Sequence, residues 1–237
     1  MQTDYLIIGA GASGLAFADE LLNHSDAHIT LVDKRHAPGG HWNDAYPFVR
    51  LHQPSVFYGV ESMRLRSVGF DTEGLNKGYL QLADGAELND YFHRVMNERL
   101  LASGRVNFIP MTEVTAEGKL RSVLSGEERD ITVNRKIVDA GFATNSVPQT
   151  HKRKFTVAET VSCVPPNDLP RLAGNHKHFT VLGAGKTAID TVVWLLGNGA
   201  KPDAIRWVIP RDPWLWNRDM TQPHETFYNR VFGGFAD

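Results

Sequence analysis

Hydrophobic and polar positions near the N-terminus follow an order that predicts three elements. Residues 5–8 are a continuous apolar run, followed by a glycine-rich stretch, apolar positions at helical spacing over residues 15–22, and a second apolar run over residues 28–32. A short continuous run is typical of a strand covered on both faces, and a stripe repeating every 3.6 residues is typical of a helix with one buried side. The pattern therefore predicts a strand–helix–strand unit.

The same order returns about 160 residues later. Residues 179–182 are a short apolar run, a glycine-rich stretch and a helical stripe over residues 189–196 follow, and a last run covers residues 204–209. In each copy the glycines lie where a strand passes into a helix, which is typical of dinucleotide-binding units. Two such units in one chain indicate electron transfer between two nucleotides, one retained and one exchanging.

The middle of the chain predicts a helix, a strand and a β-meander. Residues 89–101 have an amphipathic helical pattern, and residues 106–109 form a strand-like run. Four more runs are separated by turn residues, at 113–115, 120–124, 130–133 and 136–138. We interpret the last run as the end of the meander, which leads into Ala140 and Gly141. Small residues there let backbone meet a cofactor, or they simply end a strand.

Two aperiodic segments complete the picture. Residues 43–82 contain several aromatic residues, which favours an ordered loop packed over another element. Residues 142–177 contain four prolines and are interpreted as a connection. The predicted fold class is α/β, with two Rossmann-like dinucleotide-binding domains of which the second is incomplete. The expected boundaries are residues 1–150 with the meander, a connecting segment at 151–177, and residues 178–237.

The first glycine-rich stretch has the spacing GxGxxG at Gly9, Gly11 and Gly14. In this pattern the first glycine permits a tight turn, the second admits a pyrophosphate close to the backbone, and the third allows helix and strand to pack closely. Asp33 ends the next apolar run 19 residues after Gly14, where a carboxylate accepts hydrogen bonds from a ribose hydroxyl. The adjacent Gly39 and Gly40 form either a second backbone approach to a ligand or an ordinary turn.

The second stretch has glycines at Gly183 and Gly185 and an alanine, Ala188, at the packing position. Its last apolar run ends near Arg211 instead of an acid. A guanidinium pairs with a 2′-phosphate that a carboxylate would repel, so the sequence favours NADPH over NADH. The alternative is an exposed arginine without a ligand.

Composition excludes several classes of function. The net charge of −2 gives no global attraction to nucleic acid or to an anionic membrane, and no apolar run has the length of a membrane span. The single cysteine, Cys163, excludes a disulfide framework, a CxxC redox pair and a cysteine-rich metal site, so we expect a cytoplasmic protein without a metal. No pair of titratable residues stands out as acid and base, and the catalytic residues are left unassigned.

The segments GAGASG, GGHWNDAYPF, IVDAGFATNSVP, GAGKTA and WVIPRDPWLWNR together resemble the flavin-dependent monooxygenases that use FAD and NADPH. That group includes flavin-containing monooxygenases, Baeyer–Villiger enzymes and N-hydroxylases. The resemblance implies reduction of FAD by NADPH and oxygenation of a small organic substrate through a flavin peroxide. Two enzyme-level or non-enzyme alternatives stay open: a flavin reductase or dehydrogenase without oxygenation, and a non-catalytic module that binds FAD or NADPH.

Carried over by position, the resemblance implies two sets of cofactor-binding residues. The FAD set follows the first unit and its neighbouring segments: Gly9, Gly11, Ala12, Ser13, Gly14, Asp33, Lys34, Gly40, His41, Trp42, His52, Gln53, Ser55, Val114 and Ala140. The NADPH set follows the second unit: Gly183, Gly185, Lys186, Thr187 and Arg211.

The sequence departs from this family in two main respects. The fingerprint FxGxxxHxxxW is absent from residues 155–178, and the chain ends soon after the second strand of the second unit. We therefore expect an unfinished second domain, completed by a homodimer or by a partner chain.

Overall fold

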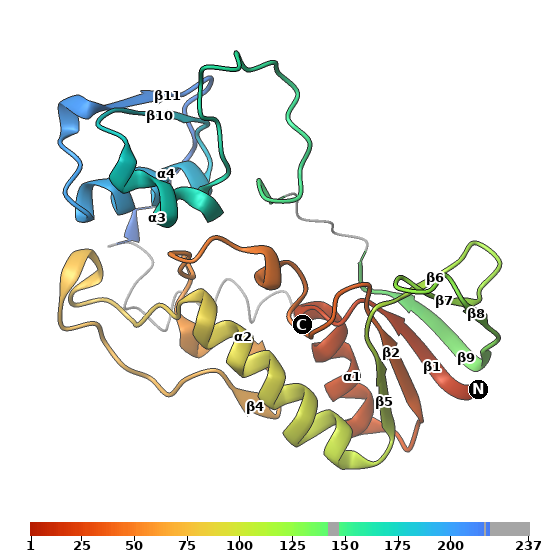
Figure 1. Ribbon diagram of the computed structural model, residues 1–237. Coiled ribbons are helices and arrows are strands. Elements are labelled where there is room, and N and C mark those ends of the chain that lie inside the picture. Colours follow the sequence, from red (N-terminus) through yellow and green to blue (C-terminus); the bar gives the residue numbers. More distant parts are fainter. Residues whose placement is uncertain (142–146, 216, 219–237) are drawn as a thin grey trace.

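A computed structural model describes residues 1–141, 147–215 and 217–218 (Figure 1). The first unit is built on a parallel sheet with the strand order β5-β2-β1-β9. Its elements begin with β1 (Gln2–Ile8), α1 (Ala12–His24) and β2 (Ile29–Val32), as the sequence predicts. The sheet is completed by β5 (Val106–Ile109) and β9 (Thr132–Asp139).

Alternate residues of β1 and β2 enter two different cores. Ile7, Ile29 and Leu31 pack with residues of α1 and of the helix after residue 84. Leu6 and Val32 point to the opposite face and pack with Leu120. That opposite face is covered by the antiparallel meander β6 (Thr112–Val114), β7 (Leu120–Ser122) and β8 (Glu128–Arg129). Burial on both faces explains why these strands are continuous apolar runs.

The interpretation of residues 136–138 as part of the meander was wrong. These residues belong to β9, which pairs with β1 in parallel up to the pair Ile8–Asp139. The preceding run at residues 130–133 is joined to the same strand, and the register shifts between Thr3 and Tyr5 on β1. β9 lies at the edge of the sheet, and most of its side chains are exposed. Its polar residues therefore gave no sign of a parallel strand.

The amphipathic helix begins earlier than predicted. It is α2 (Gly85–Arg94), and it starts with a capping box in which the Asp84 carboxylate accepts the Glu87 N–H (2.9 Å) and the Glu87 carboxylate accepts the Asp84 N–H (3.0 Å). The helical path continues as a π-helix over Val95–Leu100 and a 3-10 turn over Leu101–Ser103.

The aperiodic segment between β2 and α2 is ordered and fastened to α2. It contains 3-10 turns at Gly40–Asp44, Ser55–Phe57 and Gly74–Asn76, and the hairpin β3 (Gly59–Val60) and β4 (Met63–Arg64). The Tyr91 hydroxyl of α2 accepts the Val60 N–H and donates to the Met63 carbonyl, both at 2.6 Å. This anchor satisfies buried backbone groups of the hairpin.

The second unit consists of β10 (Phe179–Leu182), α4 (Lys186–Gly197) and β11 (Ile205–Val208), with the two strands parallel. Before it come a 3-10 turn at Pro166–Asp168, α3 (Leu169–Leu172) and a 3-10 turn at Ala173–Asn175; another 3-10 turn, Pro202–Ala204, precedes β11. Val181, Ala188 and Leu195 form its small core.

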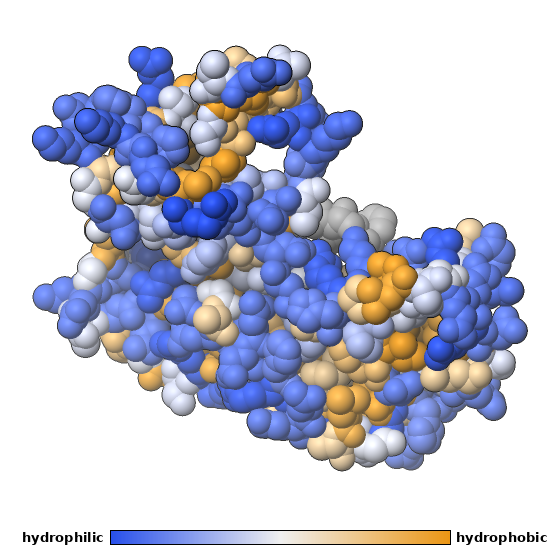
Figure 2. Space-filling model, viewed as in Figure 1, coloured by the Kyte–Doolittle hydropathy of each residue, from blue (hydrophilic) through white to orange (hydrophobic). Residues whose placement is uncertain are grey.

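The surface of the second unit carries exposed apolar residues. Within the described ranges its sheet has two strands, and Leu182 on β10 is 54% exposed. Figure 2 shows hydrophobic patches over this unit at the top of the view and over the strands at the lower right, on a largely hydrophilic face. No described helix combines the length and the apolar character needed to cross a membrane.

Candidate functional site

The first glycine-rich turn joins β1 to α1 and depends on all three glycines. Gly9 has a φ of 105°, a region that favours glycine. A Cβ on Gly14 would overlap the carbonyl oxygen of Gly9, so a side chain there would push α1 off the strand. Gly11 is the extended residue before the helix. Leu15 is the first residue to bond back, to the Gly11 carbonyl at 3.0 Å, which leaves the N–H groups of Ala12, Ser13 and Gly14 ahead of the helical ladder.

Two other segments close on this turn. The Gly39 N–H bonds to the Ala10 carbonyl at 2.8 Å, and a Cβ on Gly11 would lie 3.6 Å from the Cα of Gly40. From the other side, a Cβ on Gly9 would lie 3.3 Å from the backbone nitrogen of Gly141. The structure thus brings Gly9, Gly11, Gly40 and the end of β9 together. Helix N–H groups and bare backbone in this arrangement fit a diphosphate.

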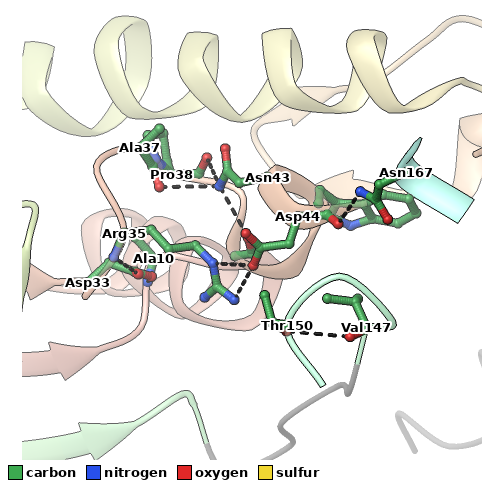
Figure 3. Close-up of polar contacts among 12 residues, drawn as sticks. Ala10, Asp33, Arg35, Ala37, Pro38, Asn43, Asp44, Val147, Thr150 and Asn167 are labelled. Carbon is green, nitrogen blue, oxygen red and sulfur yellow. Dashed lines mark hydrogen bonds and ion pairs between the residues drawn. The ribbon is translucent and has the colours of Figure 1, made fainter. Parts of the chain in front are cut away.

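Asp33 lies at the end of β2, and its carboxylate is engaged by the backbone. It is 5% exposed. One carboxylate oxygen accepts the Ala10 N–H and the other accepts the Arg35 N–H, both at 2.8 Å (Figure 3). A carboxylate has about four acceptor positions, so positions are left for a ribose hydroxyl. Lys34, the next predicted residue, is exposed.

A polar network that sequence reasoning missed holds the Gly39–Gly40 turn in place. The Arg35 guanidinium donates two hydrogen bonds to the Asp44 carboxylate, at 2.8 and 2.6 Å (Figure 3). The Asn43 amide donates to the carbonyls of Pro38 and Gly40, both at 3.1 Å. These contacts join residues that give no hydrophobic or spacing signal.

His41 and Trp42, both predicted near the flavin, lie directly after this turn. Their rings stack with centroids 5.0 Å apart, and the Trp42 indole N–H donates to the Tyr58 hydroxyl at 2.9 Å. Burial lowers the pKa of His41, and the Arg35 charge lowers it further against the opposing effect of Asp44. His41 is therefore poised to stay neutral.

The remaining residues of the predicted FAD set fall into different surroundings. Ser55 is 1% exposed, and its hydroxyl donates to the Gln81 carbonyl (2.9 Å) and accepts the Ala83 N–H (2.6 Å). Val114 pairs with Leu120 in the meander. Gln53 is half-buried on the same loop as Ser55. The contacts of Ser55 and Val114 are structural, and neither adjoins the glycine-rich turn in the contacts described above.

His52 faces the second unit. Partial burial lowers its pKa, followed by the charge of Lys186; Asp190 acts in the opposite direction, and Arg218 lowers it again. The sequence placed His52 with the flavin, whereas its charged neighbours come from α4.

The second glycine-rich turn joins β10 to α4. Gly183 has a φ of 122°, its N–H bonds to the Val208 carbonyl at 3.0 Å, and its carbonyl accepts the Trp207 indole N–H at 2.8 Å. A Cβ on Gly185 would meet no described atom within 4 Å. The first N–H to bond back is that of Ala188, to the Gly185 carbonyl at 3.0 Å.

The side chains around this turn divide into an engaged group and an exposed one. The Lys186 ammonium pairs with the Asp190 carboxylate one helical turn later. Asp190 also accepts the Tyr46 hydroxyl at 2.7 Å, and Phe48 stacks on Trp194 with centroids 5.1 Å apart. Arg211 is exposed, three residues beyond β11. The lysine–aspartate spacing of four residues was visible in the sequence, but the partner from the first unit was not.

A separate hollow of about 420 Å³ lies beside the β3–β4 hairpin. Phe57, Tyr58, Val60, Phe70 and Leu80 line it, with Glu61 and Arg64 adding charge. It adjoins neither glycine-rich turn. It is connected to the first turn only through Tyr58, which accepts the Trp42 indole N–H.

Comparison with known proteins supports the assignment of the fold. Residues 7–63 match the NAD(P)-binding Rossmann-like domain family. Uncharacterized proteins of Mycobacterium tuberculosis and Mycobacterium bovis are 47% identical over 227 residues, which is 96% of this chain and 42% of each relative. The chain therefore spans less than half the length of these curated relatives.

Three solved structures share the fold at low sequence identity. Kutzneria ornithine N-hydroxylase, solved with reduced FAD, NADP⁺ and L-ornithine, has a TM-score of 0.61 and 15% identity over 100% of this chain and 59% of its own. A flavin-containing monooxygenase of Stenotrophomonas maltophilia has a TM-score of 0.57 and 17% identity, covering 92% and 61%. A bacillithiol disulfide reductase of Staphylococcus aureus has a TM-score of 0.55 and 14% identity, covering 91% and 59%. The chain thus has the fold of flavoprotein monooxygenases and of a related reductase.

Proposed function

We propose that this chain binds FAD at the first glycine-rich turn and NADPH at the second, and serves as an oxidoreductase of the monooxygenase type that acts on a small organic substrate. The observation that carries the proposal is the pair of helix N-termini in one fold. In each, described N–H groups precede the helical ladder and the middle glycine faces no side chain. Both features suit a diphosphate.

The residues of the first turn would bind the FAD diphosphate through the N–H groups of Ala12, Ser13 and Gly14, and Asp33 would hold the ribose. The residues of the second turn would bind NADPH through the N–H groups of Lys186 and Thr187, and Arg211 would pair with the 2′-phosphate. The contact between Tyr46 and Asp190 supports this arrangement because it ties the segment after Gly40 to α4. A bound flavin would supply the acceptance of hydride and the chemistry with oxygen, and the protein would supply orientation and the exclusion of water.

A second candidate is a flavin reductase that does not oxygenate a substrate. The fold shared with a disulfide reductase favours it, as does the absence of the family fingerprint before the second unit. A non-catalytic module that binds FAD or NADPH is the third.

The test begins with the colour of the purified full-length chain. Yellow protein that bleaches on anaerobic addition of NADPH supports the proposal up to flavin reduction. Yellow protein that never bleaches supports the binding module, and protein that takes up no FAD contradicts the proposal.

Oxygen consumption then separates the two enzyme candidates. With NADPH and a panel of ketones, amines and sulfides, a monooxygenase couples oxygen uptake to an oxygenated product. A reductase releases peroxide, or consumes no oxygen, whatever compound is added.

A further inference from the structure

A charged cluster at the start of α4 includes one residue from the first unit. Asp190 accepts the Tyr46 hydroxyl at 2.7 Å and pairs with the Lys186 ammonium. Tyr46 is 6% exposed, and the side chains of Lys186 and Asp190 are 35% and 23% exposed. Tyr46 and Asp190 are separated by 144 residues in sequence, so the cluster exists only in the folded chain.

The pairing draws Lys186 away from the turn that it was predicted to serve. Lys186 is the first residue of α4, and side chains on a helix tend to point towards its N-terminus. Here the ammonium instead reaches along the helix to a carboxylate one turn later. A phosphate at the Gly183–Gly185 turn would have to compete with Asp190 for this cation.

Tyr46 determines how easily Lys186 can leave. A partly buried carboxylate that loses its cation is destabilised unless another donor compensates for it. The Tyr46 hydroxyl is such a donor, and burial together with the Asp190 charge raises its pKa, so it remains protonated and able to donate.

We propose that Asp190 and Tyr46 are positioning residues that set the affinity of the second turn for NADP(H), Asp190 by holding Lys186 back and Tyr46 by compensating Asp190 when Lys186 moves to the phosphate. This inference rests on the proposed function. It extends that function by giving a residue of the first unit control over nucleotide binding in the second.

The test measures the dissociation constant of NADP⁺ for the full chain, saturated with FAD, by calorimetry. Asp190→Asn releases Lys186 and is expected to tighten binding roughly three- to tenfold, because the hydrogen bonds involve charged but partly exposed groups. Tyr46→Phe removes the compensating donor and is expected to weaken binding by a similar factor. Asp190→Glu, which keeps the charge, is expected to stay close to the unsubstituted chain.

A double-mutant cycle separates this role from a merely structural one. In the Asp190→Asn background Tyr46→Phe is expected to have no effect on the dissociation constant, since there is no carboxylate left to compensate. Tyr5→Phe, in β1, is the matched control for loss of a tyrosine hydroxyl away from α4 and is expected to change nothing.

Three results would overturn the inference. Equal NADP⁺ affinity in all variants would show that the cluster does not act on the nucleotide. An effect of Tyr46→Phe that persists in the Asp190→Asn background would assign its role to the neighbouring Thr187, with which the Tyr46 hydroxyl also hydrogen bonds. Failure of the unsubstituted chain to bind NADP⁺ would reject the inference together with the proposed function, and is thereby distinguished from the first two.

Discussion

The two glycine-rich turns share an order of residues but differ in their surroundings. The first is enclosed by backbone from two other segments, at Gly40 and at Gly141. The second has open space at Gly185 and an exposed strand end at Val208. A ligand held between several segments leaves only when one of them moves, whereas a ligand at an open turn exchanges freely. Enclosure suits a retained nucleotide, and openness suits one that is exchanged in each cycle.

The packing position of each turn gives the largest expected difference. Gly14→Val places a side chain into the Gly9 carbonyl, and we expect it to lower the free energy of unfolding by about 3 kcal/mol or more. Ala188→Gly at the corresponding position should cost only about 1 kcal/mol, mainly through the poorer helix propensity of glycine. Urea denaturation measures both values. Similar losses for the two variants would contradict the claim that the first turn is packed more tightly.

The middle glycines separate retention from exchange. We expect Gly11→Val to abolish retained FAD, because its side chain occupies the place of the diphosphate next to Gly40. Flavin absorbance of the purified protein, referred to protein concentration, is the measurement. The matched variant Gly185→Val should leave FAD content unchanged and abolish binding of NADP⁺. A folded Gly11→Val protein with normal flavin content would be incompatible with FAD at the first turn.

The strand ends make the two turns differ in charge, with buried Asp33 at the first and exposed Arg211 at the second. We expect Arg211→Ala to weaken binding of NADPH relative to NADH by about 1 to 3 kcal/mol, the range for a charge-assisted hydrogen bond. Arg206→Ala, an exposed arginine on β11, is the control and should affect the two nucleotides equally. An equal loss for both nucleotides in Arg211→Ala would remove the 2′-phosphate from this site.

The sequence predicted those parts of the fold in which local pattern and tertiary environment agree. β1, α1 and β2 were recognisable because strands buried on both faces must be apolar and because Gly14 tolerates no side chain. β9 was assigned to the wrong sheet because an edge strand tolerates exposed polar residues. The start of α2 was placed too late, although Asp84 and Glu87 form a readable capping box.

The candidate site was predictable only where a glycine pattern marks it. The contacts that hold the two turns in place join residues distant in sequence, such as Tyr46 with Asp190 and Asn167 with Asp44. Nothing in local spacing announces such a pair, since each residue is an ordinary polar position in its own segment. His52 illustrates the limit: its position on the loop was visible, but the charges it faces were not.

The smallest expected effect concerns the histidines that follow the first turn and face the second. Burial is the first cause that lowers the pKa of both His41 and His52 in the folded chain, from an ordinary value of 6.5. As pH falls through about 6.5, the unfolded chain binds protons before the folded chain does, so the free energy of unfolding decreases. We expect His41→Gln and His52→Gln each to flatten this decrease between about pH 7 and pH 5. Because Lys186 is the second cause for His52, Lys186→Met should weaken the pH effect of His52 and leave that of His41 intact. Urea denaturation at a series of pH values tests this, and a slope unchanged by either histidine substitution would show that neither imidazole is held neutral by the fold.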